Sequence, residues 1–138
     1  MTTIFTLLVI FQLKHFLADY PLQTRYMLGK FRDDWGFAMP LLQHVLVHGL
    51  MTFAIALAYR PRMAATLMVF DMAVHFGMDR IKAGKKYLGR FKTLTAETAG
   101  NATPEQWRSS DFFWYSVGLD QGVHHLTHYA IIWMLVSR

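Results

Sequence analysis

The chain has 138 residues, of which 54% are hydrophobic, 15% aromatic and 17% charged, and its mean hydropathy is positive (+0.22). This length allows one domain, and the composition favours a membrane protein over a soluble one. The absence of cysteine excludes disulfides and thiolate metal sites. The formal charge of +5 suits anionic lipid or nucleic acid, and its distribution along the chain favours anionic lipid headgroups and no nucleic acid.

The first apolar run predicts a helix over about residues 3–20, which Pro21 ends. Its roughly 18 residues lie near the lower limit for spanning a bilayer. Lys14 lies inside this run, and we expect its long side chain to carry the ammonium group to the membrane interface. The run lacks a basic start and a small-residue cleavage site, so we expect no signal peptide.

Residues 20–40 contain Gly, Pro and aromatic residues and predict an interfacial connection. A second helix is predicted over 41–59, where Arg60-Pro61-Arg62 stops it, and a third over 62–80. Asp71 and His75 lie within the third helix. Ionisable groups are costly in lipid, by about 2.5–3.5 kcal/mol for Asp, so both should face a protein interior.

A basic interfacial segment over 80–92 and a loose loop over 93–110 precede the last predicted helix, 112–136. The expected fold is therefore all-α: a single domain, 1–138, with four transmembrane helices in an antiparallel bundle. Basic residues concentrate in the two long connections, which predicts that these are cytoplasmic and that both termini are outside. A soluble four-helix bundle is the alternative, but its helices should each have a polar face.

Pairs of His and Asp four residues apart recur in every predicted helix. Residues at this spacing share one face of an α-helix. The six pairs are His15/Asp19, His44/His48, Asp71/His75, His75/Asp79, Asp120/His124 and His124/His128. In an antiparallel bundle most of these residues lie near the cytoplasmic end. The sequence therefore predicts that they converge.

Imidazole and carboxylate groups at this spacing bind Zn, Fe, Mn or Ni, and we expect a divalent metal, with Zn first and Fe or Mn as alternatives. A site with two ions is compatible with so many ligands. The predicted ligands are His15, Asp19, His44, His48, His75, Asp79, Asp120 and His124. The competing interpretations are hydrogen bonds between helices for the His pairs and helix-end groups for Asp19 and Asp79.

Asp71 and His128 lie one turn deeper than the predicted ligands. Asp71 either orients His75 or acts as a base, and His128 is a candidate for proton handling. His125 points about 100° away from His124, so we expect it to have a structural role or to support the ligands from behind. Basic residues near the cytoplasmic end either engage phosphate on a substrate or only set the topology. These are Arg25, Arg80, Lys82 and Lys85.

Several segments resemble a family of small bacterial and phage membrane proteins, the domain-of-unknown-function family DUF3307. They are residues 13–19 (LKHFLAD) with 22–24 (LQT), then His44 and His48, His75-x-x-x-Asp79-x-x-Lys82, and Asp120-Gln121-x-x-His124. The resemblance covers nearly the whole chain and implies a bacterial or phage-encoded inner-membrane protein, without a reaction. More loosely, the motif type is similar to that of YdjM-like inner-membrane metal-dependent hydrolases.

The sequence favours a membrane-embedded metal-dependent hydrolase that acts on a lipid or lipid-linked phosphate substrate. Three alternatives remain open: an iron-dependent redox protein, a carrier of metal ions or protons, and a structural subunit of a membrane complex. The sequence also leaves open whether the protein forms a homo-oligomer.

Overall fold

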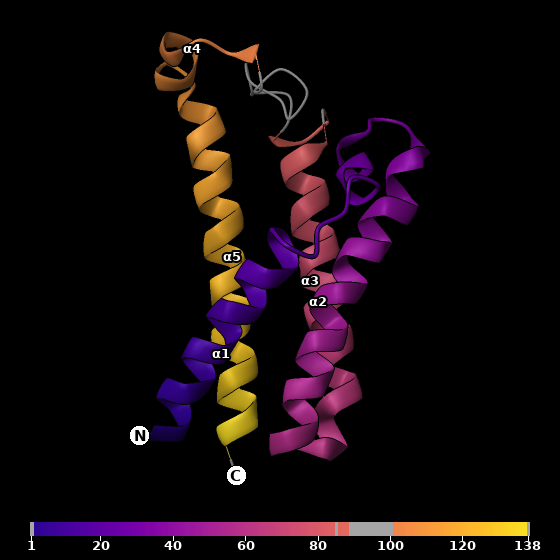
Figure 1. Ribbon diagram of the computed structural model, residues 1–138, viewed down its shortest axis with the longest axis vertical. Helices are drawn as coiled ribbons and strands as arrows, with labels where there is room; N and C mark the ends of the chain where they lie inside the picture. The colour runs from indigo at the N-terminus through magenta and orange to yellow at the C-terminus, as the bar shows by residue number, and fades with distance from the viewer. Residues whose placement is uncertain (1, 85, 89–100, 138) are drawn as a thin grey trace.

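The computed structural model describes residues 2–84, 86–88 and 101–137, and every regular element in these ranges is helical. The all-α class is thereby confirmed. The four long helices are α1 (Thr2–Asp19), α2 (Ala38–Tyr59), α3 (Ala64–Ala83) and α5 (Asp111–Val136), and the short elements are η1 (Met27–Phe31), η2 (Trp35–Phe37), η3 (Pro61–Met63) and α4 (Pro104–Arg108). The long helices alternate in direction, and both termini lie at one end of the bundle (Figure 1).

Local chemistry explains where the helices start. Pro40 lies in the first turn of α2, where a missing N–H costs little, so this helix begins three residues before the predicted start. The segment predicted as a loose loop contains α4, because Thr103 and Gln106 form a reciprocal capping box and Pro104 occupies the first turn. Much of the predicted basic segment lies outside the described residues, including Lys85 and residues 89–92.

The interior is divided into three layers along the bundle. An apolar cluster near the termini contains Leu7, Phe11, Ala56, Ala64, Leu67, Ile131, Ile132 and Leu135, and a smaller cluster near the connections contains Phe37, Leu41 and Val45. Between them, each long helix carries buried polar side chains. We call this middle region the polar layer, and it contains the His and Asp residues predicted to converge.

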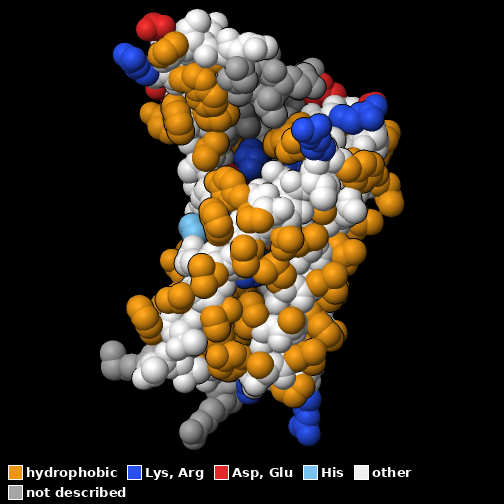
Figure 2. All heavy atoms as spheres, viewed as in Figure 1, with side chains coloured by type: hydrophobic (Ala, Val, Ile, Leu, Met, Phe, Trp, Pro, Cys, Tyr) orange, Lys and Arg blue, Asp and Glu red, His pale blue; other side chains and the backbone are white. Residues whose placement is uncertain are grey.

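The outside of the bundle is largely apolar. Large hydrophobic side chains are exposed along all four long helices, as on α1 at Phe5 (68%) and on α5 at Trp133 (68%). Figure 2 shows hydrophobic side chains over the sides of the molecule, while the outermost Lys and Arg side chains lie toward its two ends. The described residues thus expose many large apolar side chains while they bury a group of polar ones beside the two apolar clusters.

Two helical segments are long and apolar enough to cross a membrane, Thr2–Asp19 and Trp35–Tyr59. This is weak evidence for a membrane protein. Among the described helices, α3 and α5 do not meet the same criterion, so four spans are not established by length and hydropathy. The polar residues that lower the hydropathy of α3 and α5 include Asp71, Asp79, Asp120 and His124, all of them buried in the polar layer.

Gly49 brings α2 close to α3. A Cβ at this position would lie 2.5 Å from Met72 Cγ and 2.8 Å from Met72 Sδ, whereas a Cβ at Gly77 would meet no atom within 4 Å. We expect Gly49→Ala to lower stability by about 1–3 kcal/mol through overpacking. Gly77→Ala is the matched control and should be neutral or stabilising, because Ala favours the helix by about 1 kcal/mol.

Thermal unfolding of both variants in the same detergent measures this difference. Equal melting temperatures for the two alanine variants would contradict a close contact at Gly49.

Candidate metal centre

Four helices contribute side chains to the polar layer. The His and Asp residues that are four positions apart lie about one helical turn from each other, so both members of such a pair reach this layer from one face of their helix. The buried members are Lys14 and His15 on α1; His44, His48 and Thr52 on α2; Asp71, His75 and Asp79 on α3; and Asp120, His124 and His128 on α5, with half-buried Asp19 at the end of α1. The structure brings all eight predicted ligands, together with Asp71 and His128, into this layer.

The first cluster is Asp19, His44 and His48, each of which offers a ligand atom within 4.8 Å of the others. Asp19 Oδ1 lies 3.4 Å from His44 Nε2 and 3.1 Å from His48 Nε2. Ligand atoms about 2.0–2.1 Å from a tetrahedral zinc ion lie about 3.3 Å apart, so these separations fit two edges of such a site.

Asp19 differs from the other carboxylates of the layer in its partners. Its ion pairs within the described residues are all with histidines: His44 and His48 through Oδ1, and His15 Nε2 through Oδ2 at 3.0 Å. The side chain of Asp19 is 20% exposed. The carboxylate of this cluster is therefore partly accessible from outside the bundle.

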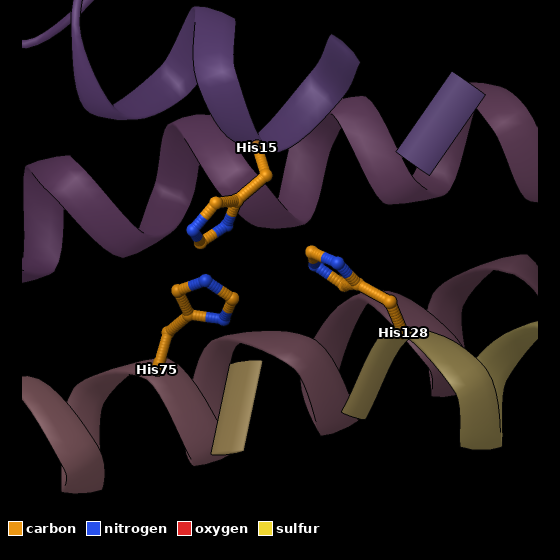
Figure 3. Close-up of side chains that lie close together, drawn as sticks. All are labelled: His15, His75 and His128. Carbon is orange, nitrogen blue, oxygen red and sulfur yellow. The ribbon is translucent and has the colours of Figure 1, made fainter. Parts of the chain in front are cut away.

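The second cluster is His15, His75 and His128, contributed by α1, α3 and α5. Figure 3 shows the three rings turned toward a common space. Their centroids are 6.0 Å apart for His15 and His75, 5.3 Å for His15 and His128, and 6.1 Å for His75 and His128. No carboxylate belongs to this cluster.

The third cluster is Asp79, Asp120 and His124. Both carboxylates already have cationic partners: Lys30 Nζ lies 2.8 Å from Asp79, and Lys82 Nζ lies 2.6 Å from Asp120. Lys82 also lies 3.7 Å from Asp79. Two ammonium groups therefore neutralise two carboxylates here, which makes this cluster the weaker candidate for a metal ion.

Asp71 is fully buried and is held by three groups from three helices. Lys14 Nζ and Thr52 Oγ1 each donate to Asp71 Oδ2 at 2.6 Å, and His75 Nδ1 lies 3.1 Å from both Asp71 Oδ1 and the backbone carbonyl of Asp71. Of the two predicted roles, these contacts suit orientation of His75 better than action as a base.

Lys14 corrects an expectation. Its ammonium group was expected at the membrane interface, but the side chain is buried and forms an ion pair with Asp71, because a carboxylate inside the bundle requires a counter-charge. Lys30 and Thr52 were missed as members of the polar layer. No spacing signal marks them: Lys30 lies in a connection, and Thr52 is one neutral residue in an apolar run.

The predicted substrate-binding cations are not gathered at one place. Arg25 is exposed, and Lys82 pairs with Asp120 inside the layer. Arg80 donates to the backbone carbonyl of Arg32 at 2.9 Å and its guanidinium lies 3.6 Å from the centroid of the Phe37 ring. Lys85 lies outside the described residues. His125 lies outside the first cluster, and its Nδ1 is 3.1 Å from Gln12 Nε2.

Several buried atoms of the layer have no hydrogen-bond partner within the described part of the chain. They are Nδ1 of His15, His44, His48 and His128, Nε2 of His75, both ring nitrogens of His124, and Oδ1 of Asp120. Unpaired buried polar atoms are costly. Their concentration in one layer, together with the affinity of imidazole nitrogens for transition-metal ions, makes this layer the candidate place for an ion.

A family model described as "Protein of unknown function (DUF3307)" matches residues 7–138. No curated protein matches the chain, and no solved structure does. The match does not bear on the looser resemblance to YdjM-like hydrolases, which stays a prediction.

The Lys14–Asp71 pair should show a strong coupling in stability. Asp71→Leu leaves the Lys14 ammonium buried without its carboxylate, and we expect a loss of about 3–5 kcal/mol. The double variant Lys14→Met/Asp71→Leu removes both charges and should be more stable than Asp71→Leu alone. Denaturant unfolding in detergent measures the free energy of unfolding of the wild type, the two single variants and the double variant, which together form a double-mutant cycle.

Lys86→Met is the control, since Lys86 is an exposed lysine. Its effect should stay within about 0.5 kcal/mol. A double variant whose loss equals the sum of the two single losses would rule out the coupling.

Proposed function

The chain belongs to the DUF3307 family, whose description names no function, and we propose from the geometry of the polar layer that it is a membrane-embedded metal-dependent hydrolase. The observation that carries the proposal is the first cluster, where Asp19, His44 and His48 meet without a lysine among their described ion pairs. Two imidazoles and one carboxylate form a recurrent ligand set of hydrolytic zinc sites, which keep an open position.

The distribution of side chains supports a membrane location with four spans. Exposed apolar residues cover all four long helices, and the charges that lower the hydropathy of α3 and α5 face the bundle interior, where a membrane protein tolerates them. Basic residues on the first long connection, including Arg25 and Arg32, support a cytoplasmic location for it and outside locations for both termini. We propose a multi-pass protein of a bacterial inner membrane.

The residues of the first centre have separable tasks. His44 and His48, one turn apart on α2, would hold the ion through Nε2, and Asp19 through Oδ1. His15 donates from Nε2 to Asp19 Oδ2, and this hydrogen bond fixes the orientation of the carboxylate. The same ring nitrogen lies 3.1 Å from Gln121 Oε1. A bound divalent metal would polarise a phosphoryl oxygen and lower the pKa of its water to about 7.

A lipid or lipid-linked phosphate fits the surroundings as substrate. The first centre lies at the end of α1, where the chain enters a connection that carries Arg25, whose side chain is exposed. Arginine suits phosphate because its guanidinium group donates two parallel hydrogen bonds. The apolar tail of a lipid would remain beside the exposed hydrophobic side chains of the helices.

Iron chemistry is the second candidate, because the same two-histidine, one-carboxylate set also holds non-haem Fe(II). The ligand set alone favours neither ion. Elemental analysis of protein purified without added metal separates them: zinc favours hydrolysis, and iron favours reaction with oxygen.

The first centre should lose its metal when a ligand is removed. We expect wild-type protein in detergent, dialysed against zinc, to retain one more equivalent of zinc than His48→Ala or Asp19→Asn, measured by mass spectrometry of the metal. His125→Ala is the matched control, because His125 is a histidine outside the three clusters. Unchanged zinc in both ligand variants would refute the assignment.

Hydrolysis requires a separate measurement. Zinc-loaded wild-type protein should release inorganic phosphate from a phosphatidate or a long-chain isoprenyl diphosphate in mixed micelles. The rate of phosphate release by His48→Ala should be lower by about 100-fold or more, because the variant loses the contribution of the metal ion to catalysis. His125→Ala should keep the rate. Zinc binding without phosphate release from either class would favour a metal carrier or structural subunit instead.

A further inference from the structure

We propose that His15, His75 and His128 form a second metal site, built only from imidazoles and separate from the centre at Asp19. The two sites share no ligand. The inference goes beyond the proposed function, since it concerns binding of a second ion and does not depend on hydrolysis.

The three residues are held in place by three different helices. Each is buried, with 5% exposure for His15 and 0% for His75 and His128. One ring nitrogen from each lies within 4.8 Å of those from the other two, and the rings face a common space (Figure 3). A modest inward shift of the side chains would bring three nitrogens to the approximately 2.0–2.1 Å that zinc requires.

Hydrogen bonds set the orientation of two of the rings. His75 Nδ1 donates to the backbone carbonyl of Asp71 at 3.1 Å, so its Nε2 carries a lone pair and has no partner in the described residues. His15 Nε2 faces Asp19 and Gln121, both acceptors, so its Nδ1 is the free nitrogen. A histidine that donates its other ring proton to a carboxylate or carbonyl is the usual arrangement at metal sites.

Packing restricts the rings further. The His75 ring stacks on His124, with centroids 3.9 Å apart and an interplanar angle of 11°. The His128 ring lies 5.2 Å from the centroid of Phe11, and Nδ1 of His128 has no described partner. These contacts hold the imidazoles close together in the absence of an ion, so little order must be gained when one binds.

The donor set defines the class of ligand. Three neutral nitrogens without an oxygen ligand suit Zn²⁺ and other transition-metal ions that prefer imidazole, and they do not suit Mg²⁺ or Ca²⁺. Lys14 Nζ lies 3.4 Å from His128 Nε2, so its ammonium group borders the site, and its positive charge is balanced by its ion pair with Asp71 at 2.6 Å. The site therefore accepts a borderline transition-metal ion of which zinc is the simplest probe.

Asp19 connects the two sites without belonging to the second. Its Oδ1 faces His44 and His48, and its Oδ2 accepts from His15 Nε2. An ion in the second site would strengthen the acidity of the His15 N–H and tighten this hydrogen bond. Binding at the two sites should therefore be coupled, although each has its own ligands.

Titration with Co²⁺, which replaces zinc and absorbs in the visible range, tests the proposal on the full chain in detergent after chelator treatment. We expect two equivalents to bind to wild-type protein, one to His128→Gln, one to His44→Ala, and none to the double variant. Mg²⁺ at the same concentrations should not compete for the site that His128→Gln removes. Gel filtration and circular dichroism establish that each variant is folded.

A second measurement leaves all three ligands of the second site unchanged. X-ray absorption of zinc in His44→Ala protein should show scattering from three imidazole rings. Two equivalents retained by His128→Gln, or fewer than two imidazoles around zinc in His44→Ala, would overturn the second site. If wild-type protein binds only one equivalent, and this equivalent is lost in His128→Gln but retained in His44→Ala, the result would support the second site and overturn the first centre.

Discussion

The structure depends on compensating charge where water is absent. A carboxylate buried without a partner costs several kcal/mol, and the polar layer places three carboxylates almost fully out of solvent. Each of these has a lysine partner from another part of the chain: Lys14 for Asp71, Lys30 for Asp79 and Lys82 for Asp120. The pairs Lys14–Asp71 and Lys82–Asp120 fix how far α1 and α5 slide along α3, because a shift of one turn would separate them.

Asp19 is the exception, and its position is the reason why we propose the metal centre there. It is half-buried at the end of α1, and its described ion pairs are with histidines. A neutral imidazole does not balance a carboxylate, whereas a divalent ion does. The charge balance of the layer thus distinguishes Asp19 from the other three carboxylates. The types of residue at these positions do not distinguish it, because all four are aspartates.

Much of this arrangement could be predicted from spacing, and the rest could not for a physical reason. The four-residue spacing of His44 and His48, or of Asp120 and His124, is a local property of one helix, so the sequence alone shows that the two residues share a face. Which charges meet across the bundle depends on packing between distant segments. Lys14 and Lys30 therefore could not be matched to Asp71 and Asp79 in advance. The capping box of α4, by contrast, was present in the sequence, as Thr103 and Gln106 three residues apart.

The order in which the helices are synthesised gives the two clusters different histories. Asp19, His44 and His48 come from α1 and α2, so their cluster can form once the first half of this sequence has been synthesised. The cluster of His15, His75 and His128 needs α5, which is synthesised after the other three long helices. The residues of the first cluster can therefore meet early, while those of the second can meet only after α5 has been made. The three-histidine cluster is in this sense a marker that α1, α3 and α5 have packed together.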